Sequence, residues 1–217
     1  TSFCHREGKK SLSQMANGDF CSIGNGPLKA IIIGDSHAGA LFTAADKMLS
    51  AAGISAIASS GGFCAPLLNG FDTGADCRRR TEIALNHVMS TSEIETIVLA
   101  AEWAVYTSGF RGDLDPDTWR DAEGVAERAV DNAEVFRRSL DVTLRQLEST
   151  GKKLVIIGPV PEFEPLGKYK EWLAKQVLRS EAEHISEAIL LLPTLPLNEY
   201  HKRNADVIEA FNDYRDI

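Results

Sequence analysis

The sequence predicts an α/β protein, a three-layer α/β/α sandwich in which helices cover both faces of a parallel sheet. Short β-branched runs alternate along the chain with longer stretches of helical periodicity, which is the pattern of such sheets. The strand runs are apolar at consecutive positions, as in strands that are buried on both faces. The chain has 217 residues, of which 44% are hydrophobic and 25% charged, and this is enough for one core. We therefore expect a single domain over residues 1–217, with its α/β core at 29–217.

The predicted elements follow one another from strand to helix. Strands are predicted at residues 28–33, 54–58, 94–101 and 154–157, and helices at residues 38–52, 81–89, 131–150, 168–192 and 199–214. The clearest helix is 131–150, where Phe136, Leu140 and Leu144 recur at helical spacing and Gly151 follows as a stop. Residues 1–28 are polar and Gly-rich without a sustained period, and we expect them to form an irregular N-terminal segment.

The four cysteines lie in two local pairs, Cys4 with Cys21 and Cys64 with Cys77. No Cys-x-x-Cys is present, which argues against a zinc ribbon or a thioredoxin-like dithiol. A local pairing closes two short loops, and each such bond would stabilise the fold by roughly 3 kcal/mol in the chain-entropy model. Four free, buried cysteines in a cytosolic protein fit the same spacing, so the spacing leaves both interpretations open.

The loop after the first predicted strand is the first candidate for chemistry, because active sites of parallel sheets lie beyond the carboxyl ends of the strands. There Gly34-Asp35-Ser36-His37 leads directly into a helix. A serine at this position has its hydroxyl above the sheet and its N–H at a helix N-terminus, where an oxyanion can be stabilised. A simple helix cap by Asp35 or Ser36 is the alternative, and the residues alone do not choose between cap and nucleophile.

Charge and composition exclude several other functions. The net charge of −8 argues against a nucleic-acid or anionic-membrane surface. No run approaches the roughly 20 apolar residues that cross a bilayer. No cluster has metal-ligand spacing, and the Gly-rich stretch 61–74 lacks the Gly-Lys-Ser/Thr of a phosphate loop. We therefore expect no metal, no cofactor and no nucleic-acid partner.

The block Ile33-Gly34-Asp35-Ser36-His37 resembles the Gly-Asp-Ser block of SGNH (GDSL-like) hydrolases, in particular the branch fused C-terminally to membrane acyltransferase family 3 proteins. Blocks similar to that branch follow the later strands in the same order; they are Gly62–Leu67, Val98–Trp103 with Tyr106, Ile156–Glu162 and residues 201–205. Proteins of that branch O-acetylate bacterial surface polysaccharides, lipopolysaccharide among them. The resemblance implies an SGNH hydrolase-like sheet in flavodoxin-like order and a periplasmic or other extracytoplasmic location. It also implies an N-terminal integral-membrane acyltransferase domain, an acyl donor and a glycan acceptor.

Carried onto this sequence, the resemblance makes Ser36 the nucleophile and its N–H one oxyanion donor. Gly62, or Gly61 beside it, falls where the family has a second backbone donor. The family's third block holds an Asn that donates to the oxyanion, but this sequence has Glu102-Trp103 there. The resemblance leaves Trp103 as an indole N–H donor or as a wall of the acyl or sugar pocket.

Asp35 and His37 are expected to line the same site. His37 is a poor base for Ser36, because neighbouring side chains at a helix start point apart, so we expect it to pack or to hydrogen bond under the loop. The resemblance also implies the two disulfides Cys4–Cys21 and Cys64–Cys77, the first of which would staple the N-terminal segment.

The largest departure from the family is the general base, a His in an Asp-x-x-His after a fifth strand. These 217 residues contain no Asp-x-x-His, and the other histidines, His5, His87, His184 and His201, are predicted away from the strand ends. We expect that the chain stops before this strand; a domain that has lost its base is the alternative.

Three functions fit these observations. The first is an O-acyltransferase that moves an acetyl or similar group to a glycan hydroxyl through a serine acyl-enzyme. The second is a carbohydrate esterase that uses the same residues, with water in place of the sugar. The third is a non-catalytic glycan-binding or docking module that lacks the base.

The chain of 217 residues is expected to show negligible esterase activity on a chromogenic acetyl ester, because a serine without a base is a weak nucleophile. Release of the chromophore measures the activity. Robust turnover that Ser36→Ala abolishes would reveal a base that the sequence pattern does not identify.

Overall fold

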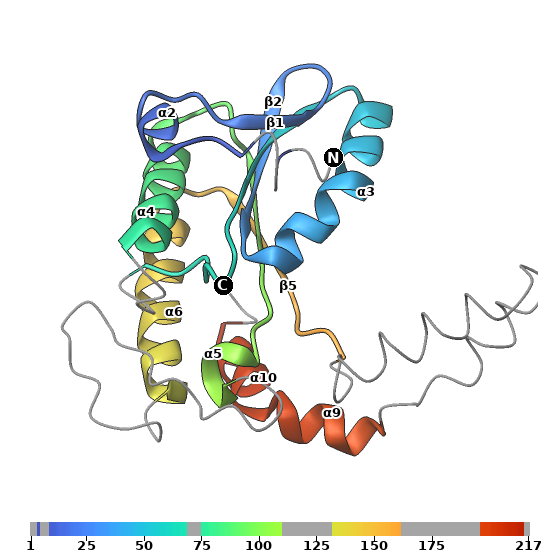
Figure 1. Ribbon diagram of the computed structural model, residues 1–217, viewed down its shortest axis with the longest axis vertical. Helices are drawn as coiled ribbons and strands as arrows, with labels where there is room; N and C mark the ends of the chain where they lie inside the picture. The colour runs from blue at the N-terminus through green and yellow to red at the C-terminus, as the bar shows by residue number, and fades with distance from the viewer. Residues whose placement is uncertain (1–3, 5–8, 69–74, 110–131, 162–195, 215–217) are drawn as a thin grey trace, which may run out of the picture.

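The computed structural model describes residue 4 and residues 9–68, 75–109, 132–161 and 196–214, and a five-stranded sheet lies at its centre (Figure 1). The strands are β1 Cys21–Gly24, β2 Leu28–Gly34, β3 Ser55–Ser60, β4 Thr96–Ala100 and β5 Lys153–Ile157. The helices in these ranges are α2 Leu12–Ala16, α3 Ser36–Ala52, α4 Ala75–Ser90, α5 Val105–Ser108, α6 Asn132–Glu148, α9 Leu197–Arg203 and α10 Ala205–Asn212.

The order of the sheet is β1-β3-β2-β4-β5, and its last four strands are parallel. Along the chain these four come second, first, third and fourth, which confirms the predicted α/β fold and flavodoxin-like order. Gly34 at the end of β2 pairs with Ser60 of β3 on one side and with Ala100 of β4 on the other. The loops that follow these three strands therefore meet at one edge of the sheet, beyond which α5, α9 and α10 lie (Figure 1).

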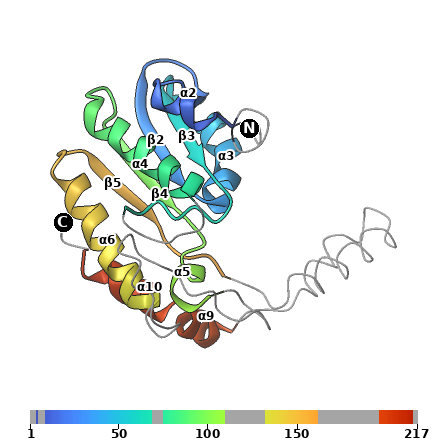
Figure 2. The ribbon, with the colours of Figure 1, turned by 60° about the vertical axis from the view of Figure 1, so that its left-hand side comes forward.

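Strand β2 is buried on both faces. Ile31 and Ile33 belong to the apolar cluster on the side of α4 and α6, whereas Ala30 and Ile32 belong to the cluster on the side of α3. Figures 1 and 2 show α3 on one face of the sheet and α4 with α6 on the other. Each isoleucine removed from water in this way contributes about 1.5–3 kcal/mol, which explains why residues 30–33 of this strand are all apolar.

The prediction that residues 1–28 are irregular is wrong for two short elements. Ser11 and Gln14 form a reciprocal capping box at the start of α2. Strand β1 pairs antiparallel with the edge of β3, with Cys21 and Ile23 on its buried side. A five-residue helix and a four-residue strand are too short to produce a period in the sequence, and contacts with the rest of the fold stabilise them.

The helix predicted at residues 199–214 is two helices, α9 and α10, which meet at Asn204. This residue is buried, has φ −106° and ψ 11°, and donates its side-chain N–H to the carbonyl of Tyr200 at 2.9 Å. Helix α4 starts at Ala75, six residues before the predicted helix at 81–89, and the helix predicted at 168–192 lies outside the described residues. Within the described ranges, no helix combines the length and the hydropathy needed to cross a bilayer.

Both disulfides that the family resemblance implies are present. Cys4–Cys21 ties residue 4 to strand β1, and Cys64–Cys77 ties the loop after β3 to the first turn of α4. The pairing question that the spacing alone left open is thereby answered in favour of two local bonds. Each bond restricts the unfolded chain and so stabilises the fold.

At Gly34 the backbone of β2 lies close to both β4 and the start of α3. A Cβ atom on this residue would lie 1.7 Å from the carbonyl oxygen of Ala100 and 2.9 Å from the Cβ of Ala38. The first of these atoms is backbone in a paired strand, so it cannot move without breaking the register of β2 and β4. The glycine thus allows the two strands to end side by side and α3 to start directly above them.

Replacement of Gly34 by alanine is expected to lower the free energy of unfolding by about 3 kcal/mol or more, because overpacking against backbone forces the strands apart. Gly158→Ala is the matched control, since a Cβ there meets no atom within 4 Å. Urea unfolding followed by circular dichroism gives both values. Equal stabilities for the two variants would contradict this account of Gly34.

Candidate active site

Ser36 is the first residue of α3 and is exposed at the carboxyl edge of the sheet. Strand β2 ends at Gly34, Asp35 has extended backbone angles, and the helix starts at once, so the turn contains no further residue. The first N–H groups of a helix have no acceptor within it and carry the positive end of the helix dipole. The Ser36 hydroxyl therefore lies beside donors that can receive a negatively charged oxygen.

Asp35 is only 1% exposed, and its side chain accepts three hydrogen bonds. One carboxylate oxygen accepts from the His37 N–H at 2.8 Å, which caps the helix. The other accepts from the Glu102 N–H at 2.9 Å and from the Tyr106 hydroxyl at 3.0 Å. One carboxylate thus joins the turn that carries Ser36 to the loop after β4.

Tyr106 is fully buried, and its hydroxyl is the only side-chain donor among the three hydrogen bonds to Asp35. Burial raises the pKa of Tyr106 well above its usual value of 10.0, and the negative charge of Asp35 adds to this effect. Tyr106 therefore stays protonated and continues to donate to Asp35 up to strongly alkaline pH.

His37 lies between two carboxylates at the mouth of this turn. Its Nδ1 atom is buried, 3.6 Å from a carboxylate oxygen of Asp35 and 3.8 Å from one of Glu102. About a third of the side chain is exposed, although Nδ1 itself is buried. The structure thus brings together Asp35, Ser36, His37 and Glu102, and the expectation that His37 packs or hydrogen bonds under the loop stays a prediction.

Trp103 occupies a different place from the one expected of an oxyanion donor. Its side chain is fully buried and packs edge-on against Phe211, at 5.2 Å between ring centroids. The indole N–H donates to the carbonyl of Ile157, at the end of β5, at 2.6 Å. Its only donor is therefore already used, and in this structure Trp103 connects the ends of β4 and β5 beneath the site.

The loop after β3 runs next to the Ser36 turn. The Gly61 N–H donates to the carbonyl of Gly34 at 3.2 Å, so Gly61 is not available as a free donor. Gly62 is exposed, and a Cβ there would meet no atom within 4 Å. The sequence left Gly61 and Gly62 as alternative oxyanion donors. Because the Gly61 N–H already donates to the Gly34 carbonyl, Gly62 is the better candidate of the two.

The two other histidines among the described residues, His87 and His201, lie on helices α4 and α9. His87 is on α4 beside Phe20, with ring centroids 4.6 Å apart, and burial lowers its pKa. His201 is exposed on α9. His5 and His184 lie outside the described residues.

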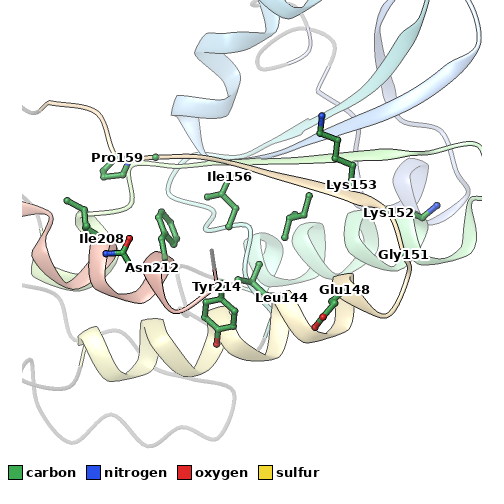
Figure 3. Close-up of a pocket in the computed structure, with 13 residues that line it drawn as sticks. Leu144, Glu148, Gly151, Lys152, Lys153, Ile156, Pro159, Ile208, Asn212 and Tyr214 are labelled. Atoms are coloured by element: carbon green, nitrogen blue, oxygen red, sulfur yellow. The ribbon is translucent and has the colours of Figure 1, made fainter. Parts of the chain in front are cut away.

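Two large hollows in the described part of the structure flank β5, and Ser36 does not line either of them. The first, about 690 Å³, lies between β5, α6 and α10, and Figure 3 shows Leu144, Ile156, Ile208 and Tyr214 around it. The second, about 620 Å³, lies on the opposite face between α3 and β5 and is mostly apolar. No three His, Cys, Asp or Glu side chains converge as a metal site would need, as far as the structure describes the chain.

Sequence reasoning did not find the role of Tyr106 or the burial of Asp35. One signal could have indicated this contact. A tyrosine that follows a buried strand is itself expected to be buried, and a buried hydroxyl needs a hydrogen-bond partner. The partner lies 71 residues away, so no local pattern identifies it.

The fold and these contacts define a class of protein: an α/β domain with an exposed serine on the turn between the first parallel strand and its helix, held by a buried aspartate. The family model of the SGNH domain fused to AT3 domains matches residues 3–216, and the chain belongs to this family. Among solved structures it is similar to the periplasmic domain of the lipopolysaccharide acetyltransferase of Salmonella ser. Paratyphi A, with 20% identity and a TM-score of 0.48. The match covers 90% of this chain and 68% of that one. No curated protein matches the chain.

Replacement of Tyr106 by phenylalanine is expected to lower the free energy of unfolding by about 1.5–3 kcal/mol at neutral pH, because it removes a hydrogen bond to a buried carboxylate. Above about pH 10 the unfolded wild type releases the tyrosine proton whereas the folded protein keeps it. The wild type then loses stability that the variant never had, so the difference between them narrows as the pH rises.

Tyr200→Phe is the matched control, since the Tyr200 hydroxyl donates to the uncharged carbonyl of Pro159 at 3.0 Å. Its loss is expected to be about 0.5–1.5 kcal/mol. Chemical denaturation between pH 7 and pH 11 measures both. A deficit for Tyr106→Phe no larger than that of Tyr200→Phe would contradict the role assigned to the Asp35 contact.

Proposed function

We propose that this domain transfers an acyl group, acetyl or similar, to a hydroxyl of a glycan through an acyl-enzyme at Ser36. The observation that carries the proposal is the exposed Ser36 at the start of the 17-residue helix α3, on a turn that Asp35 fixes to the next loop. Membership of a family whose domains are fused to AT3 domains supports an acyl-transferring role.

The reaction proceeds in two steps. In the first, the Ser36 hydroxyl oxygen attacks the carbonyl carbon of the acyl donor, its proton passes to a base, and the bond to the donor's leaving group breaks as that group takes a proton. In the second, a sugar hydroxyl attacks the acyl-serine, loses its proton to the base, and the Ser36 oxygen leaves with a proton. Water in the second step would give an esterase with the same residues.

The negative charge that develops on the carbonyl oxygen needs donors that are in place before the reaction. We assign the backbone N–H of Ser36 as the first donor, supported by its position in the first turn of α3. Gly62 supplies the second, since the Gly61 N–H beside it already donates to Gly34. Asp35 is a positioning residue, because it holds the turn and touches no reacting atom.

The base is the part that the sequence leaves open, since it has no Asp-x-x-His. His37 is adjacent to Ser36 along the helix, and its Nδ1 faces the carboxylates of Asp35 and Glu102. We therefore do not assign it as the base, and the experiment below adds one from solution.

We further propose an extracytoplasmic location, a membrane acyltransferase domain as the partner in the same protein, and a surface glycan as the acceptor. The two disulfides support the location, because such bonds persist in oxidising compartments. The fusion to AT3 domains that defines the family supports the partner.

The proposal is tested by acetylation of the folded chain with p-nitrophenyl acetate in the presence of imidazole, which takes the place of the base. Peptide mapping by mass spectrometry is expected to find the acetyl group on Ser36, about tenfold or more above other exposed serines, because oxyanion donors lower this barrier. Ser90 and Ser149 are internal controls, since both are exposed and donate their hydroxyls to helix carbonyls.

The selectivity for Ser36 should disappear in urea, where the turn is lost, and Ser36→Ala should leave only the background on the control serines. Acetylation of Ser36 at the same rate as Ser90 in the folded chain would contradict the proposed nucleophile.

A further inference from the structure

The Cys64–Cys77 disulfide joins the loop that carries Gly62 to the first turn of α4. Cys64 comes two residues after Gly62, and both cysteines are buried. The Cys64 N–H donates to the carbonyl of Gly61 at 3.3 Å, and the Gly61 N–H donates to the carbonyl of Gly34 at 3.2 Å. A continuous series of bonds therefore runs from α4 through the loop to the end of β2, where the turn of the candidate site begins.

The disulfide lies directly against the backbone that precedes Gly62. A Cβ atom on Gly61 would lie 2.5 Å from the Sγ atom of Cys64 and 3.2 Å from its Cβ atom. Gly61 is buried, whereas Gly62 beside it is exposed. Because the sulfur and Gly61 are in contact, the position of the disulfide constrains the peptide that joins Gly61 to Gly62.

The hydrogen bond from Cys64 also sets the direction of the Gly62 N–H. The Gly61 carbonyl and the Gly62 N–H belong to one planar trans peptide, in which the two groups point in opposite directions. Since the carbonyl accepts from the Cys64 N–H, the Gly62 N–H points away from Cys64. Two consecutive glycines would otherwise allow this peptide many orientations. Cys64 thus orients the proposed second donor.

Helix α4 gives the disulfide a firm support. Cys77, Thr81 and Leu85 recur at steps of four on one buried face of this helix, which packs on the face of the sheet opposite α3 (Figures 1 and 2). Leu85 is fully buried in the apolar core, and the Thr81 hydroxyl donates to the carbonyl of Ala65 at 3.2 Å. The first turns of α4 therefore hold the loop by a covalent bond at Cys64 and by a hydrogen bond at the next residue.

The second disulfide, Cys4–Cys21, ties residue 4 to strand β1 and does not bridge the loop after β3. The two disulfides join cysteines that are 17 and 13 positions apart, so they restrict the unfolded chain to a similar degree. Loss of either disulfide is therefore expected to lower the free energy of unfolding by a similar amount, but only loss of Cys64–Cys77 releases the loop. The chain thus contains a matched control for the role of this disulfide.

We propose that the Cys64–Cys77 disulfide is a positioning element of the active site, so that acyl transfer at Ser36 depends on the oxidation state of these two cysteines; this rests on the proposed function. The disulfide holds the Gly62 N–H in the orientation that receives the developing negative charge, and such a donor lowers the barrier only if it is in place beforehand. When the disulfide is reduced, the Ser36 turn persists because Asp35 holds it, but the second donor is no longer fixed. The domain therefore becomes fully competent only after the two cysteines are oxidised.

The experiment compares two double variants of the chain in the acetylation assay with p-nitrophenyl acetate and imidazole. Cys64→Ser/Cys77→Ser is expected to lower the acetylation of Ser36 by about fivefold or more, because one oxyanion donor is no longer fixed. Cys4→Ser/Cys21→Ser should acetylate Ser36 as the wild type does. The control serines should be acetylated equally in all three proteins, and circular dichroism with urea unfolding checks that both variants fold and lose similar stability.

Reversibility separates positioning from a general effect of substitution. In Cys4→Ser/Cys21→Ser the remaining disulfide is opened with a phosphine, which takes an oxygen atom from water and becomes its oxide, while each sulfur gains one electron and one proton. After the phosphine is removed, acetylation of Ser36 should fall by the same factor. Oxidised glutathione then closes the disulfide and is itself reduced to two thiols, and the acetylation of Ser36 should return. Peptide mapping confirms the state of the disulfide and distinguishes acetyl-serine from acetyl groups on the free thiols.

Unchanged acetylation of Ser36 in the first double variant would overturn the proposal, as would an equal loss in the second or a loss that reoxidation does not reverse. If the first variant does not fold, Gly61→Ala decides, because its Cβ would displace the loop from the intact disulfide. Acetylation of Ser36 should then fall in Gly61→Ala but not in Gly158→Ala, whose Cβ meets no atom within 4 Å, and equal values would overturn the proposal. The wild type alone tests the nucleophile, and the difference between variants tests the disulfide, so the two failures are distinguishable.

Discussion

The structure depends most on one buried carboxylate, that of Asp35. It is 1% exposed and accepts hydrogen bonds from the N–H groups of His37 and Glu102 and from the hydroxyl of Tyr106. Burial of an ionised group costs desolvation free energy, which hydrogen bonds from surrounding donors offset. Loss of one donor therefore leaves part of that desolvation free energy uncompensated and destabilises the fold. Two of these donors, Glu102 and Tyr106, lie 67 and 71 residues after Asp35 in the sequence, so the carboxylate holds the start of α3 and the loop after β4 in one arrangement.

The same constraint explains why two adjacent residues have opposite environments. Asp35 points under the turn, and Ser36 is exposed above it as the first residue of the helix. Gly34 makes this possible, because only without a Cβ can β2 end against the Ala100 carbonyl and bring the Glu102 N–H within reach. The result is a rigid turn whose donors have their orientation before a substrate arrives, which is the condition for oxyanion stabilisation.

The sequence predicted the parts of this arrangement that depend on local patterns, and it missed the parts that depend on contacts between residues far apart in the sequence. The four parallel strands were predictable, since each has a run of consecutive apolar residues that the sheet buries, and their order was an implication of the family resemblance. The short elements within residues 1–28 and the burial of Asp35 were not, because long-range contacts create them. Trp103 and Tyr106 show the limit best: both follow β4 and are only three residues apart, yet one donates to Ile157 and the other to Asp35. The path of the chain between them determines this difference, and no local period encodes that path.

The two halves of the candidate site are held by different chemistry. Hydrogen bonds to Asp35 fix the Ser36 turn, whereas the Gly61–Cys64 loop has two consecutive glycines and would be flexible without the bond to Cys77. A disulfide persists where the compartment is oxidising, but the hydrogen bonds form in any compartment. In a reducing cytosol the turn that carries the proposed nucleophile, Ser36, would keep its geometry, while the loop that carries the proposed second donor, Gly62, would lose its covalent support. The Cys64–Cys77 bond thus supports the loop of the proposed site and is stable in the proposed extracytoplasmic compartment, so the two proposals are consistent with each other.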